Sequence, residues 1–137
     1  MGYLSINHEN IHHLKNFIDN IGTSSKEFRY YSYRNPDEVI DNHLVTFLLC
    51  DIVAVGYGHL DKEDDRVWLG ICVKDDQCGK GYGKKIMKKL INSYDGDIWL
   101  SVDADNERAI NLYKLFSFNI ISEDDTVVYM KRNATSI

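Results

Sequence analysis

Residues 78–85 of the chain read CGKGYGKK, and this glycine-rich stretch constrains the fold more than any other feature of the sequence. Glycine costs backbone entropy on folding. Three alternating glycines therefore indicate a turn whose backbone conformation, or whose close approach to a ligand, side chains would block. The stretch follows VWLGICV (67–73), which is rich in strand-forming residues, and it precedes a segment with apolar residues at helical spacing. The sequence therefore predicts a strand, a glycine turn and a helix in succession.

Such a turn can bind an anion, because free N–H groups at a helix start point outward and the helix dipole favours negative charge. Five lysines fall within the same ten residues of a chain whose net charge is −5: Lys80, Lys84, Lys85, Lys88 and Lys89. The lysines alone fit a local anion site or a solvated helix face equally well. The glycines match neither the G-x-x-x-x-G-K-S/T phosphate loop nor the G-x-G-x-x-G dinucleotide fingerprint. A tight turn that binds nothing is the alternative.

The other periodic segments predict an α+β fold. Strands are expected at 44–50, 52–60, 67–73, 97–103, 118–122 and 126–131, and helices at 7–20, 25–31, 82–94 and 106–116, with a further turn at Pro36. Short turns, such as the acidic one at 61–65, imply hairpins and antiparallel pairing, whereas the crossover from 67–73 to 97–103 implies a parallel pair. We therefore expect one domain, 1–137, built on a mixed, mostly antiparallel sheet of about six strands flanked by helices.

Composition excludes several classes of protein. The chain is 44% hydrophobic and 27% charged, which is ordinary for a globular protein, and it has no apolar run near the roughly 20 residues of a membrane span. The net charge of −5 argues against nucleic-acid binding. The three cysteines form no C-x-x-C pair, which favours a reducing compartment, and the N-terminus lacks the pattern of a signal peptide. We expect a cytoplasmic protein with no nucleic-acid or membrane partner.

A second motif lies in DADNERAINLYKLFSF (103–118), where Asn106, Ala109, Leu112 and Tyr113 fall at helical spacing. A lone tyrosine in such a pattern fits a core position. The core is the favoured position for it on the pattern alone; the functional alternative is a site edge, where a hydroxyl with an ordinary pKa near 10 stays protonated at neutral pH and can protonate a leaving group.

The two stretches, in this order, resemble the GNAT superfamily of acyl-CoA-dependent N-acyltransferases. Residues 78–83 fit the family's glycine loop, Gln/Arg-x-x-Gly-x-Gly/Ala, except that Cys78 holds the Gln/Arg position. Residues 106–118 fit N-x-x-A-x-x-L-Y-x-x-x-G-F, except that Ser117 replaces the glycine that usually leaves the helix in a left-handed conformation. The resemblance covers at least residues 44–131.

The resemblance implies that acetyl-CoA lies in a cleft where the strands 67–73 and 97–103 splay apart at the centre of the sheet. The residues that it places around acetyl-CoA are Ile71, Cys72 and Val73 beside the pantetheine arm, and Cys78, Gly79, Lys80, Gly81, Tyr82, Gly83 and Lys84 at the pyrophosphate. Asn106 would contact the pantetheine or the CoA end, and Tyr113 would protonate the departing thiolate. An amine would attack the thioester directly in a ternary complex, with no metal and no covalent intermediate.

The general base is sought at the end of GYGHLD (56–61). His59 and Asp61 end this strand at the edge of the expected cleft, and the ordinary histidine pKa suits base chemistry near neutrality. An ordinary core or surface histidine is the alternative. Asp103, at the end of the neighbouring strand, and a water chain are other candidates for the base.

The stretch FRYYSYR (28–34) corresponds to the wall of the acceptor site in this family, and it could also pack on the sheet. With GYGHLD and WLGICV it is similar to acetyltransferases of bacterial sugar and surface-glycan pathways, which implies a small-molecule amine acceptor of the amino-sugar type. The alternatives are a protein or peptide amine, a non-catalytic acyl-CoA-binding module and a purely structural domain. Relatives of this kind include monomers and homodimers, and either state is compatible with the sequence.

Overall fold

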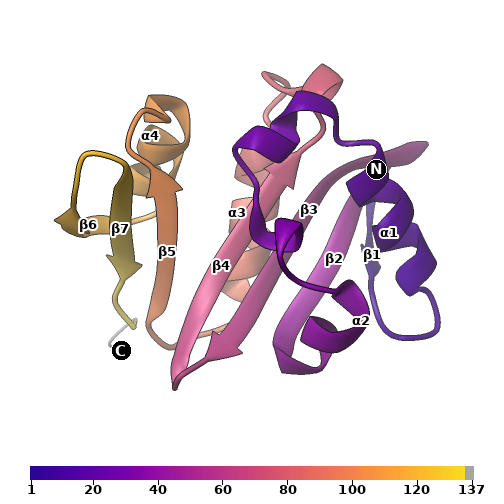
Figure 1. Ribbon diagram of the computed structural model, residues 1–137, viewed down its shortest axis with the longest axis horizontal. Coiled ribbons are helices and arrows are strands. Elements are labelled where there is room, and N and C mark those ends of the chain that lie inside the picture. The colour runs from indigo at the N-terminus through magenta and orange to yellow at the C-terminus, as the bar shows by residue number, and fades with distance from the viewer. Residues whose placement is uncertain (135–137) are drawn as a thin grey trace.

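A twisted seven-stranded sheet spans the protein in the order β1-β2-β3-β4-β5-β7-β6 (Figure 1). This is a computed structural model, and it describes residues 1–134 without the side chains of residues 23 and 24. The strands are β1 (Gly2–Ser5), β2 (His43–Asp51), β3 (Val53–Glu63), β4 (Arg66–Val73), β5 (Ile98–Asp103), β6 (Asn119–Glu123) and β7 (Val127–Arg132). Neighbouring strands are antiparallel except for the parallel pair β4–β5, which confirms the predicted mixed sheet.

The sheet differs from the prediction in two places. It has seven strands rather than about six, because β1 pairs with β2 at the sheet edge. Strand β3 continues to Glu63, so the acidic turn predicted at 61–65 narrows to Asp64 and Asp65, whose φ angles of 51° and 64° close the hairpin. Asp61 consequently lies within a strand, and its side chain shares a face with His59.

The α-helices are α1 (Ile11–Asp19), α2 (Pro36–Val39), α3 (Tyr82–Asn92) and α4 (Glu107–Leu115). The helix predicted at 25–31 is wrong: two short 3-10 turns, 22–26 and 30–32, carry this segment instead. The helix predicted from 106 begins one residue later, because the Asn106 side chain accepts a hydrogen bond from the Ala109 N–H and caps α4. Similarly, α1 begins at Ile11 rather than at Asn7.

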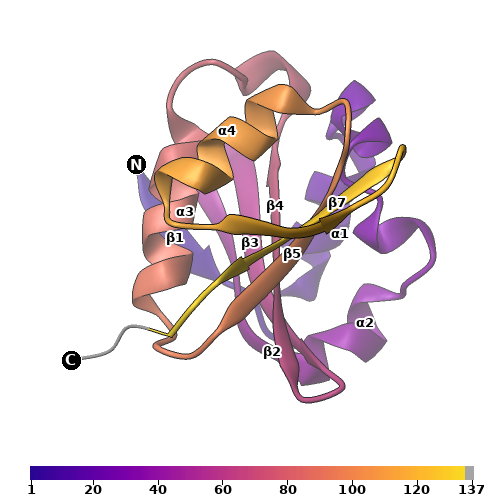
Figure 2. The ribbon, with the colours of Figure 1, turned by 90° about the vertical axis from the view of Figure 1, so that its left-hand side faces the viewer.

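Helices cover both faces of the sheet. Figure 2 shows α3 and α4 on one side, and α1, α2 and the segment between them on the other. On the first side, Ile86, Met87 and Leu90 of α3 are fully buried against the sheet. On the second side, Leu14 and Phe17 of α1 pack in a core that includes Tyr57 of β3. Among residues 1–134, no helix is long and apolar enough to cross a membrane.

The parallel pair at the centre of the sheet comes apart. Pairing between β4 and β5 is confined to Val67 with Ile98 and Trp68 with Trp99. Beyond these residues β5 continues to pair with β7, and β4 continues to pair with β3. The two halves of the sheet therefore diverge toward the carboxyl ends of β4 and β5, which confirms the predicted splaying of the central parallel pair.

Candidate active site

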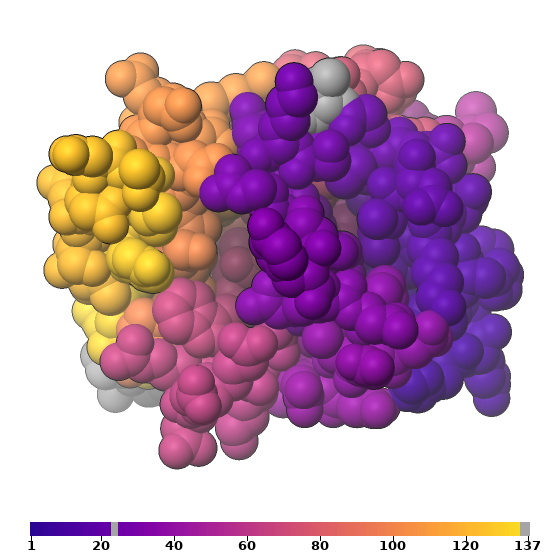
Figure 3. Space-filling model, in the orientation of Figure 1, coloured from indigo at the N-terminus to yellow at the C-terminus, as the bar shows by residue number. Residues whose placement is uncertain are grey.

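A cavity of about 900 Å³ follows the divergence of β4 and β5. Figure 3 shows the hollow between the purple segment 28–34 and the orange α4–β5 region, with β4 behind it. The cavity is lined by thirteen of the fourteen residues that the sequence placed in the site, namely His59, Asp61, Ile71, Cys72, Val73, Cys78, Gly79, Gly81, Tyr82, Gly83, Lys84, Asn106 and Tyr113. The remaining one, Lys80, does not line it, and its Nζ donates a hydrogen bond to Gln77 at 3.0 Å.

The glycine loop leaves the first turn of α3 open. Gly79 and Gly81 have φ angles of 84° and 81°, in the left-handed region where a side chain would be strained. Gly81 is the N-cap of α3, and no side chain caps the N–H groups that follow it. These N–H groups and the helix dipole form a site suited to a phosphate.

The cations are distributed differently from the expectation. Of the five clustered lysines, Lys84 lines the cavity, whereas Lys89 does not line it, and its Nζ lies 4.7 Å from the centre of the Tyr3 ring. A cation that the sequence reading missed, Arg108 of α4, also lines the cavity. Its guanidinium lies 3.6 Å from the position that a Cβ on Gly79 would occupy. The only signal for it was its place in the first turn of the second motif, two residues after Asn106.

Tyr113 of α4 lines the cavity although only 7% of its surface is exposed. Burial raises the pKa of its hydroxyl above 10, and Cys72 and Glu27 act in the same direction. The hydroxyl therefore stays protonated at neutral pH, as a proton donor must.

Asp61 ends a chain of hydrogen bonds that has one direction. The Tyr30 hydroxyl donates to Oδ2 of Asp61 at 2.6 Å, so its oxygen accepts from Nε2–H of His43 at 2.9 Å. Nδ1 of His43 then accepts from the Thr46 hydroxyl at 2.7 Å. Burial lowers the pKa of His43 to about 4, in agreement with a neutral ring. The other carboxylate oxygen of Asp61, Oδ1, is buried without a hydrogen-bond partner among the described residues.

His59 is neither at the end of a strand nor at the surface, because it lies inside β3 and is 1% exposed. Its Nδ1 lies 2.7 Å from the Tyr57 hydroxyl, and its Nε2 edge lies over Gly70 of β4. Burial lowers the pKa of His59 well below 6.5, and His43 and Arg34 act in the same direction. The sequence suggested that His59 has an ordinary pKa near neutrality, and this expectation is wrong because the buried ring has a lowered pKa.

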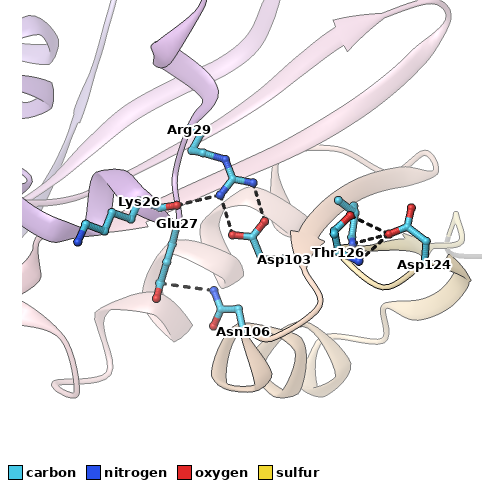
Figure 4. Close-up of polar contacts among 8 residues, drawn as sticks. Lys26, Glu27, Arg29, Asp103, Asn106, Asp124 and Thr126 are labelled. Carbon is cyan, nitrogen blue, oxygen red and sulfur yellow. Dashed lines mark hydrogen bonds and ion pairs between the residues drawn. The ribbon is translucent and has the colours of Figure 1, made fainter.

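The segment before α2 forms the opposite wall of the cavity, to which Phe28, Tyr30 and Arg34 contribute. Arg29 reaches across to the end of β5, where it donates to both oxygens of Asp103 at 2.8 and 2.6 Å (Figure 4). Glu27 accepts from Nδ2 of Asn106 at 3.5 Å. Because Asp103 is paired with a guanidinium, its carboxylate is less available as a general base than the sequence reading allowed.

The family model described as the acetyltransferase (GNAT) family matches residues 10–118. The chain belongs to the GNAT acetyltransferase family. The match includes both motifs, namely the glycine loop and residues 103–118, and all of the segment 28–34 that walls the cavity.

The solved structures to which this GNAT chain is similar share its fold at low sequence identity. An acetyltransferase of the GNAT family from Streptococcus pneumoniae has a TM-score of 0.78 at 15% identity, over 98% of this chain and 99% of that one. The ribosomal-protein-S18-alanine N-acetyltransferase from Escherichia coli has a TM-score of 0.73 at 17% identity, over 99% and 95%. A phosphinothricin acetyltransferase from Sinorhizobium meliloti, in complex with AcCoA, has a TM-score of 0.73 at 12% identity, over 97% and 88%.

A curated relative is closer in sequence over a shorter stretch. The mycothiol acetyltransferase of Corynebacterium jeikeium is 38% identical over 66 residues. This stretch is 45% of the present chain and 19% of that relative's length.

Proposed function

We propose that the protein transfers the acetyl group of acetyl-CoA to the primary amine of a small molecule by direct attack in a ternary complex. One observation carries this proposal: a single cavity is lined by the open start of α3, by Tyr113 and by the buried pair His59 and Asp61. Acyl transfer from the thioester of acetyl-CoA to an amine requires a site for the phosphates and a proton donor for the departing sulfur. It also requires groups that bind the acceptor's ammonium and take its proton.

The residues of the glycine loop fit the pyrophosphate of acetyl-CoA. The N–H groups of Tyr82, Gly83 and Lys84 follow the uncapped Gly81, and the side chains of Lys84 and Arg108 supply positive charge beside them. Strand β4 from Ile71 to Val73 lines the cavity where β5 has left it, so its backbone would lie beside the pantetheine arm. Asn106 already caps α4 with its oxygen, and Nδ2, which donates one hydrogen to Glu27, has a second N–H for any contact with CoA.

At the other end of the cavity, Oδ1 of Asp61 would accept a hydrogen bond from the acceptor's ammonium group. A buried carboxylate oxygen without a partner is costly, and a cationic ligand would relieve that cost. His59 would take the proton as the amine attacks, and Tyr113 would donate a proton to the departing sulfur.

Two features favour a small, polar acceptor. The pair Arg29–Asp103 bridges the two walls of the cavity and places charged groups in its lining. The wall also carries Arg34 and Glu63, whose Nε and Oε1 lie 3.8 Å apart, and such groups suit a molecule rich in hydroxyls, as an amino sugar is. The likeness to a mycothiol acetyltransferase supports the same choice.

The first experiment is calorimetric titration of the protein with acetyl-CoA, beside CoA and ADP. Lys84→Ala is expected to weaken binding, because Lys84 lines the cavity, whereas Lys88→Ala on the exposed side of α3 is the matched control. Absence of binding by folded protein would overturn the proposal.

Turnover is then followed as thiol release with three amines: D-glucosamine, butylamine and a short alanine-terminated peptide. Activity with D-glucosamine above the other two supports the small polar acceptor. Preference for the peptide would assign a protein or peptide substrate instead. Acetyl-CoA binding without turnover of any of the three would leave a binding module as the function.

A further inference from the structure

His59 is joined to a second cavity by the phenols of two tyrosines. Its Nδ1 lies 2.7 Å from the Tyr57 hydroxyl, and the Tyr57 hydroxyl lies 2.5 Å from that of Tyr31. Tyr57 is fully buried, whereas Tyr31 is half-buried and lines a separate cavity of about 210 Å³ under α1. The chain His59–Tyr57–Tyr31 thus runs from the main cavity, which His59 lines, to the second one.

A proton taken up by His59 cannot stay there at low cost. The ring is 1% exposed. Asp61 is the carboxylate nearest to it in sequence, and Oδ2 of Asp61 already accepts a hydrogen bond from the Tyr30 hydroxyl. Burial makes an imidazolium unfavourable, and the lowered pKa of His59 expresses that cost. An ammonium acceptor nevertheless has to lose a proton before its nitrogen can attack. The proton therefore needs a route away from the ring.

We propose that Tyr57 and Tyr31 form a proton relay that carries charge from His59 to the second cavity while substrates fill the main one. This inference rests on the proposed function and adds two residues to it. The starting arrangement has Nδ1–H of His59 donating to Tyr57, Tyr57 donating to Tyr31, and Tyr31 donating to water. Nε2, the nitrogen over Gly70, then carries a lone pair on the side of the main cavity.

The transfer balances step by step. The ammonium N–H bond breaks and an Nε2–H bond forms, while the Nδ1 proton moves to the Tyr57 oxygen. The former Tyr57 proton moves to the Tyr31 oxygen, and the former Tyr31 proton moves to water in the second cavity. Every residue ends neutral, with the hydrogen bonds reversed. After the products leave, Nε2–H releases its proton to water in the open main cavity. The protonated water in the second cavity returns a proton to the Tyr31 oxygen, the Tyr31 proton moves back to Tyr57, and the Tyr57 proton moves back to Nδ1, which restores the start.

The neighbouring chain through His43 lacks this property. Its members are satisfied in a single direction that ends at the Asp61 carboxylate, so the Tyr30 hydroxyl cannot reverse without leaving Oδ2 unpaired. Each hydroxyl of Tyr57 and Tyr31, by contrast, can donate and accept in either direction. Reversibility is what a proton relay requires, and of these two chains the one through Tyr57 combines it with cavities at both ends.

The test compares Tyr57→Phe and Tyr31→Phe with Tyr3→Phe, in which an exposed tyrosine on β1 loses one hydroxyl. The activity is measured with whichever of D-glucosamine, butylamine and the peptide the wild type turns over. Near neutral pH we expect kcat to fall at least tenfold in both relay variants, with the KM for acetyl-CoA unchanged. The loss should disappear as the pH rises and the amine arrives already neutral. A loss that is equal at every pH, or no loss, would overturn the relay.

A second measurement needs no turnover. With ¹⁵N-labelled histidine, the Nδ1 resonance of His59 is expected to move in Tyr57→Phe and also in Tyr31→Phe, which does not touch the ring. An Nδ1 signal unchanged by Tyr31→Phe would mean that the chain is not coupled. If the wild type acetylates none of the amines, the proposed function fails, and this measurement still decides whether the hydrogen-bonded chain exists. If transfer occurs with parallel pH profiles, the relay alone fails.

Discussion

The imidazole of His59 lies directly over the α-carbon of Gly70, its partner across β3 and β4. A Cβ added to Gly70 would stand 2.4 Å from both Cε1 and Nε2 of the ring. The glycine therefore creates the space in which a buried histidine can reach the cleft from inside a strand.

Gly70→Ala should displace this ring. Because Tyr57 holds the other side of the imidazole, we expect the added methyl to lower the free energy of unfolding by about 1–3 kcal/mol and to lower kcat further than the stability loss explains. Urea unfolding and steady-state kinetics measure the two effects. Gly2→Ala is the control, since a Cβ there meets nothing within 4 Å. Wild-type kinetics in Gly70→Ala would show that the position of His59 does not matter.

The ion pair between Arg29 and Asp103 supports a prediction about acceptor binding. Arg29→Ala is expected to raise the KM for the acceptor several-fold while leaving that for acetyl-CoA unchanged, because the pair bridges the acceptor side of the cavity. The Arg29 side chain is 53% exposed, so a double-mutant cycle on the free energy of unfolding should give a coupling below about 1 kcal/mol.

The matched control for Arg29→Ala is Lys15→Ala, which removes the exposed pair of Lys15 with Asp37 on α1 and α2. Its stability effect should be of similar size, and its acceptor KM should equal that of the wild type. Equal changes in acceptor KM for both variants would contradict a role of the Arg29 bridge in the site.

Local patterns predicted the parts of the site that lie close together in sequence. In each of these parts a residue within the motif determines the local conformation. Gly81 adopts the positive φ that begins α3, and Asn106 caps α4. The sequence of GYGHLD placed His59 and Asp61 at the end of a strand beside the expected cleft, whereas β3 continues to Glu63 and both side chains lie on one face. It could not say that this face is covered by the segment 28–43, and that cover determines the burial of His59.

Contacts between distant segments had no signal in the sequence. Arg29 and Asp103 are 74 residues apart, and neither belongs to a motif that specifies the other. The sequence could not distinguish Lys89 from the other clustered lysines, but in the structure its ammonium contacts the ring of Tyr3, 86 residues away, and does not line the cavity. Strand β1 is only four residues long and owes its conformation to pairing with β2, so its own residues did not reveal it.

Ser117 adopts the left-handed conformation, with a φ of 70°, that the motif assigns to glycine. The N–H of Phe118 bonds to the Tyr113 carbonyl and closes the end of α4 around it. Ser117→Gly should therefore raise the free energy of unfolding by about 1 kcal/mol, because glycine adopts this conformation without strain.

Ser93→Gly, at the end of α3, is the control for Ser117→Gly. Ser93 has a φ of −90°, and its hydroxyl donates to the Lys89 carbonyl at 2.6 Å, so glycine should give no gain there. Urea midpoints of the two variants decide the comparison. A loss of stability in Ser117→Gly would mean that the serine side chain makes a contribution larger than the backbone strain.

The neutral state of His43 predicts how stability depends on pH. Its pKa is lowered to about 4 in the folded protein, from 6.5, because the ring is buried in the chain that ends at Asp61. Between these two values the unfolded state binds more protons than the folded state, so the free energy of unfolding rises with pH. Stability should be complete above pH 6.5 and should fall by on the order of 3 kcal/mol as the pH approaches 4. His59, whose pKa is also lowered, adds a loss of the same sign.

Urea unfolding between pH 7 and pH 4.5 measures this slope. In His43→Gln the slope should decrease by up to one proton, because the group that must stay neutral on folding is gone, although the variant is less stable at pH 7 through loss of the bond to Tyr30. If the free energy of unfolding of His43→Gln depends on pH as steeply as that of the wild type, a group other than His43 causes the pH dependence. A wild-type stability that rises as the pH falls from 6.5 would mean that the His43 ring is protonated in the folded state. Nδ1–H of His43 would then donate to the Thr46 hydroxyl, which reverses that hydrogen bond and leaves those to Tyr30 and Asp61 as assigned.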